Sequence, residues 1–246
     1  MRKIAVALSK GGVGKSTTAV SLAYGLSKID EKILLIDTDT QNQCAGMFGV
    51  EPEMGLSDLI LDELPPMTAL TECRHNLWLL SAGNNLSEAK RAISQKQFRG
   101  EETLLNTFDP YQKLFDFVIL DTAPGWDSLS VNVLFYATEI ISPVNLEVLS
   151  LGGLGKFVQN VEAVKQFRSE LEIKFVLPTF FDGRVKKSQE ILDQLTKYFS
   201  DKLCNPIRYS VRLSEAPAHG KTIFEYAPKD RGTIDYGKFV ARVLNG

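Results

Sequence analysis

The chain has 246 residues, of which 44% are hydrophobic and 24% charged, enough apolar material to bury a core without disulfides or metals. Its 28 basic and 30 acidic residues give a net charge of −2, which argues against a protein that coats nucleic acid with a wholly basic surface. The widely spaced Cys44, Cys73 and Cys204 argue against a disulfide framework or a zinc module. No targeting segment and no apolar run of roughly 18 residues is apparent, so we expect a cytoplasmic protein.

Short apolar runs alternate with longer helical patterns along the chain. The runs that predict buried strands are Lys3–Leu8, Lys32–Asp37, Leu77–Leu80, Phe117–Asp121, Glu139–Pro143, Ile173–Pro178 and Ile207–Val211. The segments that predict helices are Ser16–Ser27, Ser128–Ala137, Leu151–Ser169, Lys187–Phe199 and Ile234–Leu244. This alternation predicts an α/β fold, a doubly wound and mostly parallel sheet with helices on both faces. We expect one domain over residues 1–246, with an elaborated middle at 51–110 where periodicity is weak.

A glycine-rich segment, Ser9–Thr17, lies between the first predicted strand and the first predicted helix and reads S-K-G-G-V-G-K-S-T. Its glycines allow successive N–H groups to point at phosphate oxygens, and the helix that follows adds its positive N-terminal end. Such a phosphate loop would bring Lys15 to the β- and γ-phosphates and the Ser16 hydroxyl to Mg²⁺. The predicted cofactor-binding residues here are Gly11, Gly12, Val13, Gly14, Lys15, Ser16 and Thr17.

Lys10 gives this loop a second lysine, and Ser9 stands where the standard pattern has glycine. The K-G-G-V-G-K-S form resembles the deviant Walker A box of the ParA/MinD family of P-loop ATPases. The resemblance implies that Lys10 reaches across a homodimer interface to the phosphates of the partner's ATP. A second cation there would stabilise the charge that develops on the transferred phosphoryl group, as an arginine finger does.

Two predicted strands end in aspartates, at Asp37-Thr38-Asp39 and at Asp121. Carboxyl ends of parallel strands are where ligands bind, so these carboxylates are expected beside the phosphate loop. Asp121 resembles the family's Walker B aspartate, which holds Mg²⁺ directly or through water. Asp39 resembles the switch I residue that orients or activates the attacking water. Asp37 resembles the residue of that element that supports the metal and the phosphate loop. Thr40 and Ala123 replace prolines that are usual in these motifs.

The resemblance continues to the end of the chain. The segments Val211–Lys221 and Tyr226–Gly232 are very similar to stretches typical of ParA proteins. In that family the strand end at Pro178 and the S-E-A-P loop with Glu215 and Pro217 flank the adenine. These three residues are therefore predicted neighbours of the base or ribose.

Charge is unevenly distributed along the chain. Residues 1–173 carry a net charge of −7 and residues 174–246 a net charge of +5, which suggests a basic face on an acidic body. In ParA relatives a C-terminal basic face binds DNA without sequence preference, and Arg184 and Arg212 match family positions linked to DNA. For any single lysine an ordinary solvated surface residue is the favoured interpretation, whereas the cluster with Arg212 favours DNA. The candidates on charge alone are Lys186, Lys187, Lys202, Arg208, Lys221 and Lys229.

Three readings follow from these features. The first is a slow, partner-stimulated ParA-type ATPase that dimerises on binding ATP and then binds the DNA of the nucleoid. A ParB-like or other cargo adaptor would stimulate hydrolysis and release it. The cargo would be a plasmid, a chromosome or a protein organelle such as the carboxysome. The second is a MinD-like membrane ATPase, which needs a free C-terminal amphipathic helix and is disfavoured because that helix is short. The third is an electron-transfer or metabolic relative, disfavoured because no cysteine lies beside Asp121 in the sequence.

Overall fold

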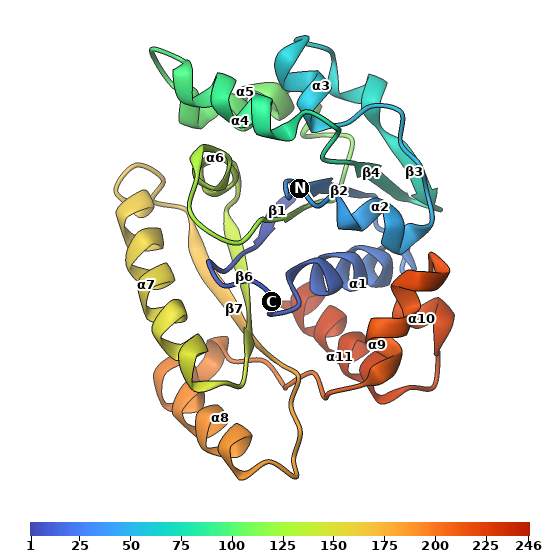
Figure 1. Ribbon diagram of the computed structural model, residues 1–246, viewed down its shortest axis with the longest axis vertical. Helices are drawn as coiled ribbons and strands as arrows, with labels where there is room; N and C mark the ends of the chain where they lie inside the picture. The colour runs from blue at the N-terminus through green and yellow to red at the C-terminus, as the bar shows by residue number, and fades with distance from the viewer.

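The computed structural model describes residues 1–246, apart from the side chains of residues 148 and 149. The described strands form a seven-stranded sheet in the order β3-β4-β2-β5-β1-β6-β7 (Figure 1). Neighbouring strands are parallel except β3 and β4, which pair antiparallel. The strands are β1 (Arg2–Val6), β2 (Ile33–Asp37), β3 (Thr71–Arg74), β4 (Leu77–Leu80), β5 (Phe117–Asp121), β6 (Glu139–Asn145) and β7 (Glu172–Thr179).

Helices cover both faces of this sheet, which confirms the predicted doubly wound α/β architecture (Figure 1). Side chains of α3 to α8 pack in one hydrophobic cluster, and those of α1, α2, α10 and α11 pack in the other. The helices are α1 (Lys15–Ser27), α2 (Gln43–Phe48), α3 (Leu56–Leu61), α4 (Leu86–Gln95), α5 (Thr103–Phe108), α6 (Ser128–Tyr136), α7 (Val148–Lys165), α8 (Lys186–Phe199), α9 (Val211–Glu215), α10 (Ile223–Tyr226) and α11 (Arg231–Asn245).

The central strands place the predicted acidic residues side by side. All residues of β2 and β5 are buried, as their continuous apolar runs predict for strands covered on both faces. The two strands are parallel and in register, with Asp37 opposite Asp121 at their carboxyl ends. On the other side of β5, Val6 at the end of β1 is the register partner of Asp121. The phosphate loop that follows β1 therefore begins next to the two carboxylates.

Two segments differ from the sequence-based expectation. The prediction of a strand over Ile207–Val211 is wrong. Ile207 is buried and its N–H donates to Pro178 O at 2.8 Å. However, the segment forms only an isolated bridge, between Arg208 and Phe181, and α9 already begins at Val211. The segment makes a few backbone hydrogen bonds with residues 178–181 and is buried beside the sheet, but these bonds do not extend into a regular strand. The antiparallel edge strand Thr71–Arg74 was not predicted, because it is short and largely polar.

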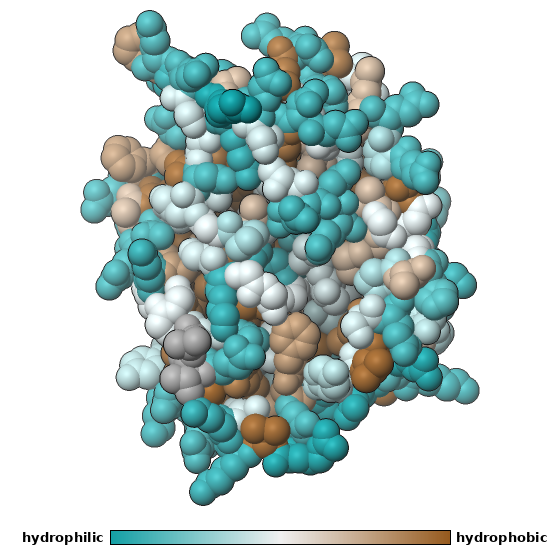
Figure 2. Space-filling model, viewed as in Figure 1, coloured by the Kyte–Doolittle hydropathy of each residue, from teal (hydrophilic) through white to brown (hydrophobic). Residues whose placement is uncertain are grey.

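The C-terminal helix α11 is part of the core. Its Tyr236, Phe239 and Val243 are buried, and the hydroxyl groups of Tyr236 and Thr18 of α1 lie 3.1 Å apart. Gly25 allows close approach of the two helices, because a Cβ there would lie 2.5 Å from Val240 Cγ2. In the described part of the chain, no helix combines the length and apolar character needed to cross a membrane. The face drawn in Figure 2 is covered mainly by hydrophilic side chains, with apolar ones scattered between them.

A glycine pair joins α2 to the segment that follows α9. Gly49 and Gly220 have φ values of 66° and 59°, and a Cβ added to Gly220 would lie 2.7 Å from Gly49 Cα. Gly220→Ala is therefore expected to lower the free energy of unfolding by about 1–3 kcal/mol, measured by urea denaturation. Gly237→Ala in α11 is the control, because its Cβ meets nothing within 4 Å. An unchanged urea midpoint for Gly220→Ala would contradict the close packing.

Candidate nucleotide and metal site

The loop between β1 and α1 has the geometry of a phosphate cradle. Gly12 and Gly14 adopt φ values of 69° and 87°, a region that favours glycine. Gly14 is the N-cap of α1, and no side chain caps the helix, so its first N–H groups are available to an anion. Val13 anchors the loop: its side chain is buried in the core and its carbonyl accepts a hydrogen bond from Thr179 Oγ1 at 3.0 Å.

A cavity of about 390 Å³ opens over this loop. It brings together most of the predicted phosphate-loop residues and Asp39, although Asp39 is more than twenty residues away in sequence. Pro178, Glu215 and Pro217 are not among its described lining residues, so their placement at the base or ribose stays a prediction. The lining residues are Gly11, Gly12, Gly14, Lys15, Ser16, Thr17, Asp39, Gln41, Gln43, Pro124 and Phe180.

The side chain of Lys15 is oriented by a hydrogen bond to the backbone of its own loop. Its side chain is almost fully buried, and Nζ donates a hydrogen bond to the carbonyl oxygen of Lys10 at 2.9 Å. Burial lowers the pKa of Lys15, while the carboxylates of Asp121 and Asp39 act in the opposite direction. A cation positioned by the backbone before ligand binding costs little reorganisation when a phosphate arrives.

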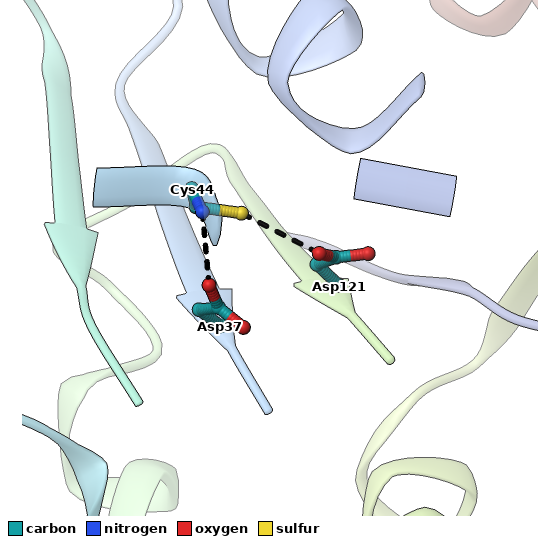
Figure 3. Close-up of side chains that lie close together, drawn as sticks. All are labelled: Asp37, Cys44 and Asp121. Atoms are coloured by element: carbon teal, nitrogen blue, oxygen red, sulfur yellow. Dashed lines mark hydrogen bonds between the residues drawn. The ribbon is translucent and has the colours of Figure 1, made fainter. Parts of the chain in front are cut away.

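Asp37 and Asp121 are both fully buried but have different surroundings (Figure 3). The two oxygens of Asp37 accept hydrogen bonds from the N–H groups of Asp39, at 2.9 Å, and Cys44, at 3.1 Å. Asp121 Oδ2 accepts a hydrogen bond from Cys44 Sγ at 3.5 Å, whereas Oδ1 has no hydrogen-bond partner among the described residues. Asp37 therefore fixes the loop that carries Asp39, and Asp121 keeps an oxygen available for a ligand.

Burial raises the pKa of both carboxyl groups, and repulsion between the two raises that of Asp121 further. Ser16 and Lys15 act against this shift at Asp121. Two buried acidic groups without a compensating cation are costly, and a bound divalent ion offsets that cost. The orphaned Asp121 oxygen, together with Ser16 and the phosphate cradle, fits Mg²⁺ bound with a nucleoside triphosphate.

Cys44 is a site residue that the sequence analysis did not identify. It lies in the first turn of α2, just after the predicted switch I segment, and is fully buried between the two carboxylates. Burial raises the pKa of its thiol, and the nearby charges of Asp37 and Asp121 raise it further. Only its position shortly after Asp39 could have drawn attention to it.

Lys10 points away from the phosphate cavity. Its Nζ contacts Glu147 Oε2 at 3.0 Å, Ser150 Oγ at 2.8 Å and Asn145 Oδ1 at 3.4 Å, all near the junction of β6 and α7. The hydrogen bond and positive charge of Lys10 lower the pKa of Glu147. The side chains of the two lysines therefore have different surroundings: Lys15 lines the cavity, whereas Lys10 Nζ is bonded to residues at the junction of β6 and α7.

The predicted DNA-contacting residues lie on two exposed segments. Arg184 lies between β7 and α8 and pairs with Asp182 at 2.7 Å, while Arg212 in α9 pairs with Glu215 at 2.7 Å. The bridge between Phe181 and Arg208 joins the two segments. The side chains of Lys186, Lys187 and Lys221 are also exposed.

Two of the residues selected on charge alone already form ion pairs within the fold. Arg208 donates from Nε and Nη2 to the two carboxylate oxygens of Asp235, each at 2.8 Å. Lys202 Nζ lies 3.1 Å from Glu172 Oε1. Their charges are partly neutralised, so they contribute less to a basic face than the exposed lysines.

These features define a P-loop nucleoside triphosphatase. They are the mostly parallel sheet, the glycine-rich phosphate loop, the buried Lys15 and the Asp121 carboxylate at the end of a neighbouring strand. Residues 1–173 match the family model described as "AAA domain". The chromosome-partitioning ATPase Soj of Thermus thermophilus is 32% identical over 246 residues, covering 99% of this chain and 96% of that protein. The chain belongs to the ParA/MinD family of P-loop ATPases, within its Soj/ParA branch of partitioning ATPases.

Solved structures share this fold. Cobyrinic acid a,c-diamide synthase from Mycobacterium smegmatis, with bound ADP and magnesium, is 26% identical, with a TM-score of 0.86 over 100% of this chain and 94% of that chain. Apo McdA of Cyanothece shares the fold at 24% identity, with a TM-score of 0.87 and 99% of both chains covered. The protein is an ATP hydrolase, and its cofactors are ATP and Mg²⁺.

Proposed function

We propose that this partitioning ATPase forms an ATP-sandwich dimer that binds DNA without sequence preference and positions or segregates a cargo. The observation that carries the proposal is the position of the Lys10 side chain, whose Nζ contacts Glu147 and Ser150 instead of lining its own phosphate cavity. A lysine that is not used in its own site is available to a facing subunit. Its transfer from Glu147 to the partner's phosphates would make dimerisation depend on ATP.

Hydrolysis in the dimer would use residues that line the cavity together with the buried Asp121. Lys15 would hold the terminal phosphates, and Ser16 and Asp121 would hold Mg²⁺, which supplies charge neutralisation on the phosphate oxygens when bound. Asp39 lines the cavity and is half-buried, so its carboxylate could accept a hydrogen bond from the attacking water. A ParB-like or other adaptor that completes this arrangement would stimulate hydrolysis and end the dimeric state.

DNA binding would use the exposed basic residues of the β7–α8 segment and of α9. One copy offers few of them, and two of these arginines are already paired with acidic neighbours. A dimer doubles the number of phosphate contacts, and affinity for DNA depends steeply on that number. The same dependence would place the ATP-bound protein on the nucleoid and release it after hydrolysis, moving a cargo such as a plasmid, chromosome or protein organelle.

The test is DNA binding by Lys186→Ala/Lys187→Ala, which removes two exposed charges at the start of α8. With ATP and Mg²⁺ the variant is expected to bind duplex DNA at least about tenfold more weakly, with a slope of log affinity against log salt reduced by about 2 per chain. Lys28→Ala/Lys32→Ala removes the same charge from exposed positions at the opposite end of the strands and is the control. Equal binding in ADP and ATP, or no binding at low salt, would contradict the proposal.

A MinD-like membrane function is less well supported. It requires an amphipathic C-terminal helix that is free to lie on lipid. The apolar residues of α11 are instead packed against α1, with Tyr236, Phe239 and Val243 buried. Co-sedimentation with anionic liposomes that depends on ATP and on α11 would revive that function.

A further inference from the structure

Phe180 combines an unusual backbone conformation with an unusual position for an aromatic residue. It directly follows the last residue of β7 and has a φ value of 56°, in the left-handed region that bulky side chains rarely adopt. The residue is 42% exposed and lines the cavity over the phosphate loop, where it is the only aromatic residue among the described lining residues. A strained residue in a ligand cavity is a candidate for function rather than for packing.

The two neighbours of Phe180 hold it in this conformation. On one side, Thr179 is buried and its Oγ1 donates a hydrogen bond to the carbonyl of Val13 in the phosphate loop at 3.0 Å. On the other side, the N–H of Phe181 donates to the carbonyl of Ile207 at 3.0 Å. The chain therefore turns at Phe180 between two anchored residues, and a left-handed φ is the result.

This turn brings the ring to the start of α1. A Cβ placed on Gly14, the N-cap of α1, would lie 3.7 Å from Phe180 Cζ. By contrast Pro178, which the sequence predicts beside the base or ribose, is buried and is not among the described lining residues. The apolar surface that the end of β7 presents to the cavity is thus the ring of Phe180.

The order of the strands separates this ring from the polar part of the lining. The phosphate loop follows β1, while Asp39, Gln41 and Gln43 follow β2, which is two strands from β1 on one side. Phe180 follows β7, which is two strands from β1 on the other side. Phosphates and Mg²⁺ suit the loop and the carboxylates, so the side of β7 is left for the apolar faces of a nucleoside.

We propose that the ring of Phe180 packs against the base of the bound nucleotide. Stacking on an aromatic ring uses the face that every nucleobase has, so it adds affinity without selecting one base. The contact is the same before and during hydrolysis, because the base is remote from the phosphate that is transferred. Loss of the ring should therefore weaken nucleotide binding and leave the chemical step intact.

Calorimetric titration with ADP and Mg²⁺ tests this directly, without any measurement of turnover. Phe180→Ala is expected to lower the affinity for ADP roughly 5- to 150-fold. Phe180→Tyr keeps an aromatic ring and should bind ADP about as tightly as the wild type. Phe98→Ala is the matched control, because Phe98 is 84% exposed and is not among the described residues that line this cavity.

A second variant separates the ring from the strained backbone. Phe180→Gly removes the ring but suits a positive φ, so it should lose as much affinity for ADP as Phe180→Ala. It also serves if the alanine variant does not fold, as judged by circular dichroism. With saturating ATP, the turnover number of either variant should stay within about twofold of the wild-type value while KM rises.

Wild-type affinity for ADP in folded Phe180→Ala or Phe180→Gly would overturn the proposal. A turnover number that falls as far as the affinity would do the same, because the ring would then act on the phosphate loop instead of the base. Retained affinity in Phe180→Gly alone would assign the effect to the backbone. ADP binding is measured without DNA or adaptor, so this result is independent of the proposed partitioning function.

Discussion

Lys15→Ala is expected to lower the turnover number for ATP by about 10²–10³-fold, the cost of removing one preorganised group that stabilises transition-state charge. Lys15 is the cation buried in the cavity, and its Nζ is already oriented by the carbonyl of Lys10. Its loss also leaves the buried Asp121 without the favourable charge that acts on it. Weaker ATP binding should therefore accompany the loss of turnover.

Phosphate release from ATP and the affinity for a fluorescent ATP analogue measure the two effects separately. Lys28→Ala is the matched control, because Lys28 is exposed at the other end of the same helix. Wild-type turnover in Lys15→Ala, with a folded protein, would show that another group holds the terminal phosphates.

Asp39→Ala is expected to separate ATP binding from hydrolysis. The Asp39 carboxylate lines the cavity, and Oδ1 accepts a hydrogen bond from the N–H of Gln41 at 3.0 Å. Because Asp37, not Asp39, holds the loop through two backbone N–H groups, the substitution should leave the loop in place. Removing the group that orients or activates water is expected to lower the hydrolysis rate by about 10²–10⁴-fold while ATP stays bound.

Single-turnover hydrolysis in the presence of excess protein measures the chemical step directly. Asp39→Asn preserves size and can still orient water, so its rate should lie between those of the wild type and Asp39→Ala. Asp62→Ala removes an exposed carboxylate at the end of α3 and should hydrolyse ATP normally. Normal hydrolysis by Asp39→Ala would assign the water to another residue.

The central strands and the phosphate loop could be predicted from the sequence because their signals are local. Continuous apolar runs identify β2 and β5, and the glycines and lysines of residues 9–17 identify the loop. The edge strand β3 was not predicted because only one of its four residues is buried, and it is antiparallel to its neighbour β4. The apolar Ile207 was misleading because the backbone hydrogen bonds of its segment with the end of β7 are too few to form a regular strand before α9 begins.

Contacts between distant residues explain what else was missed. Nothing in the sequence connects Lys10 with Glu147 or Arg208 with Asp235, because these pairs depend on how β6, α7 and α11 are arranged. Cys44 likewise acquires its neighbours only when α2 folds back onto the ends of β2 and β5. Residue types and spacing predicted the carboxylates and the lysines, whereas the fold revealed their partners.

The most direct measurement of the central claim is the mass of the ATP-bound protein in solution. Static light scattering of Asp39→Ala with ATP and Mg²⁺ should give twice the monomer mass, because ATP persists and holds the two chains together. The double variant Lys10→Ala/Asp39→Ala should remain monomeric under the same conditions, although the residues that line its cavity are the same as in Asp39→Ala. A dimer of the double variant with unaltered stability would contradict the role of Lys10 across the interface, and a monomeric Asp39→Ala with ATP bound would contradict the ATP-dependent dimer itself.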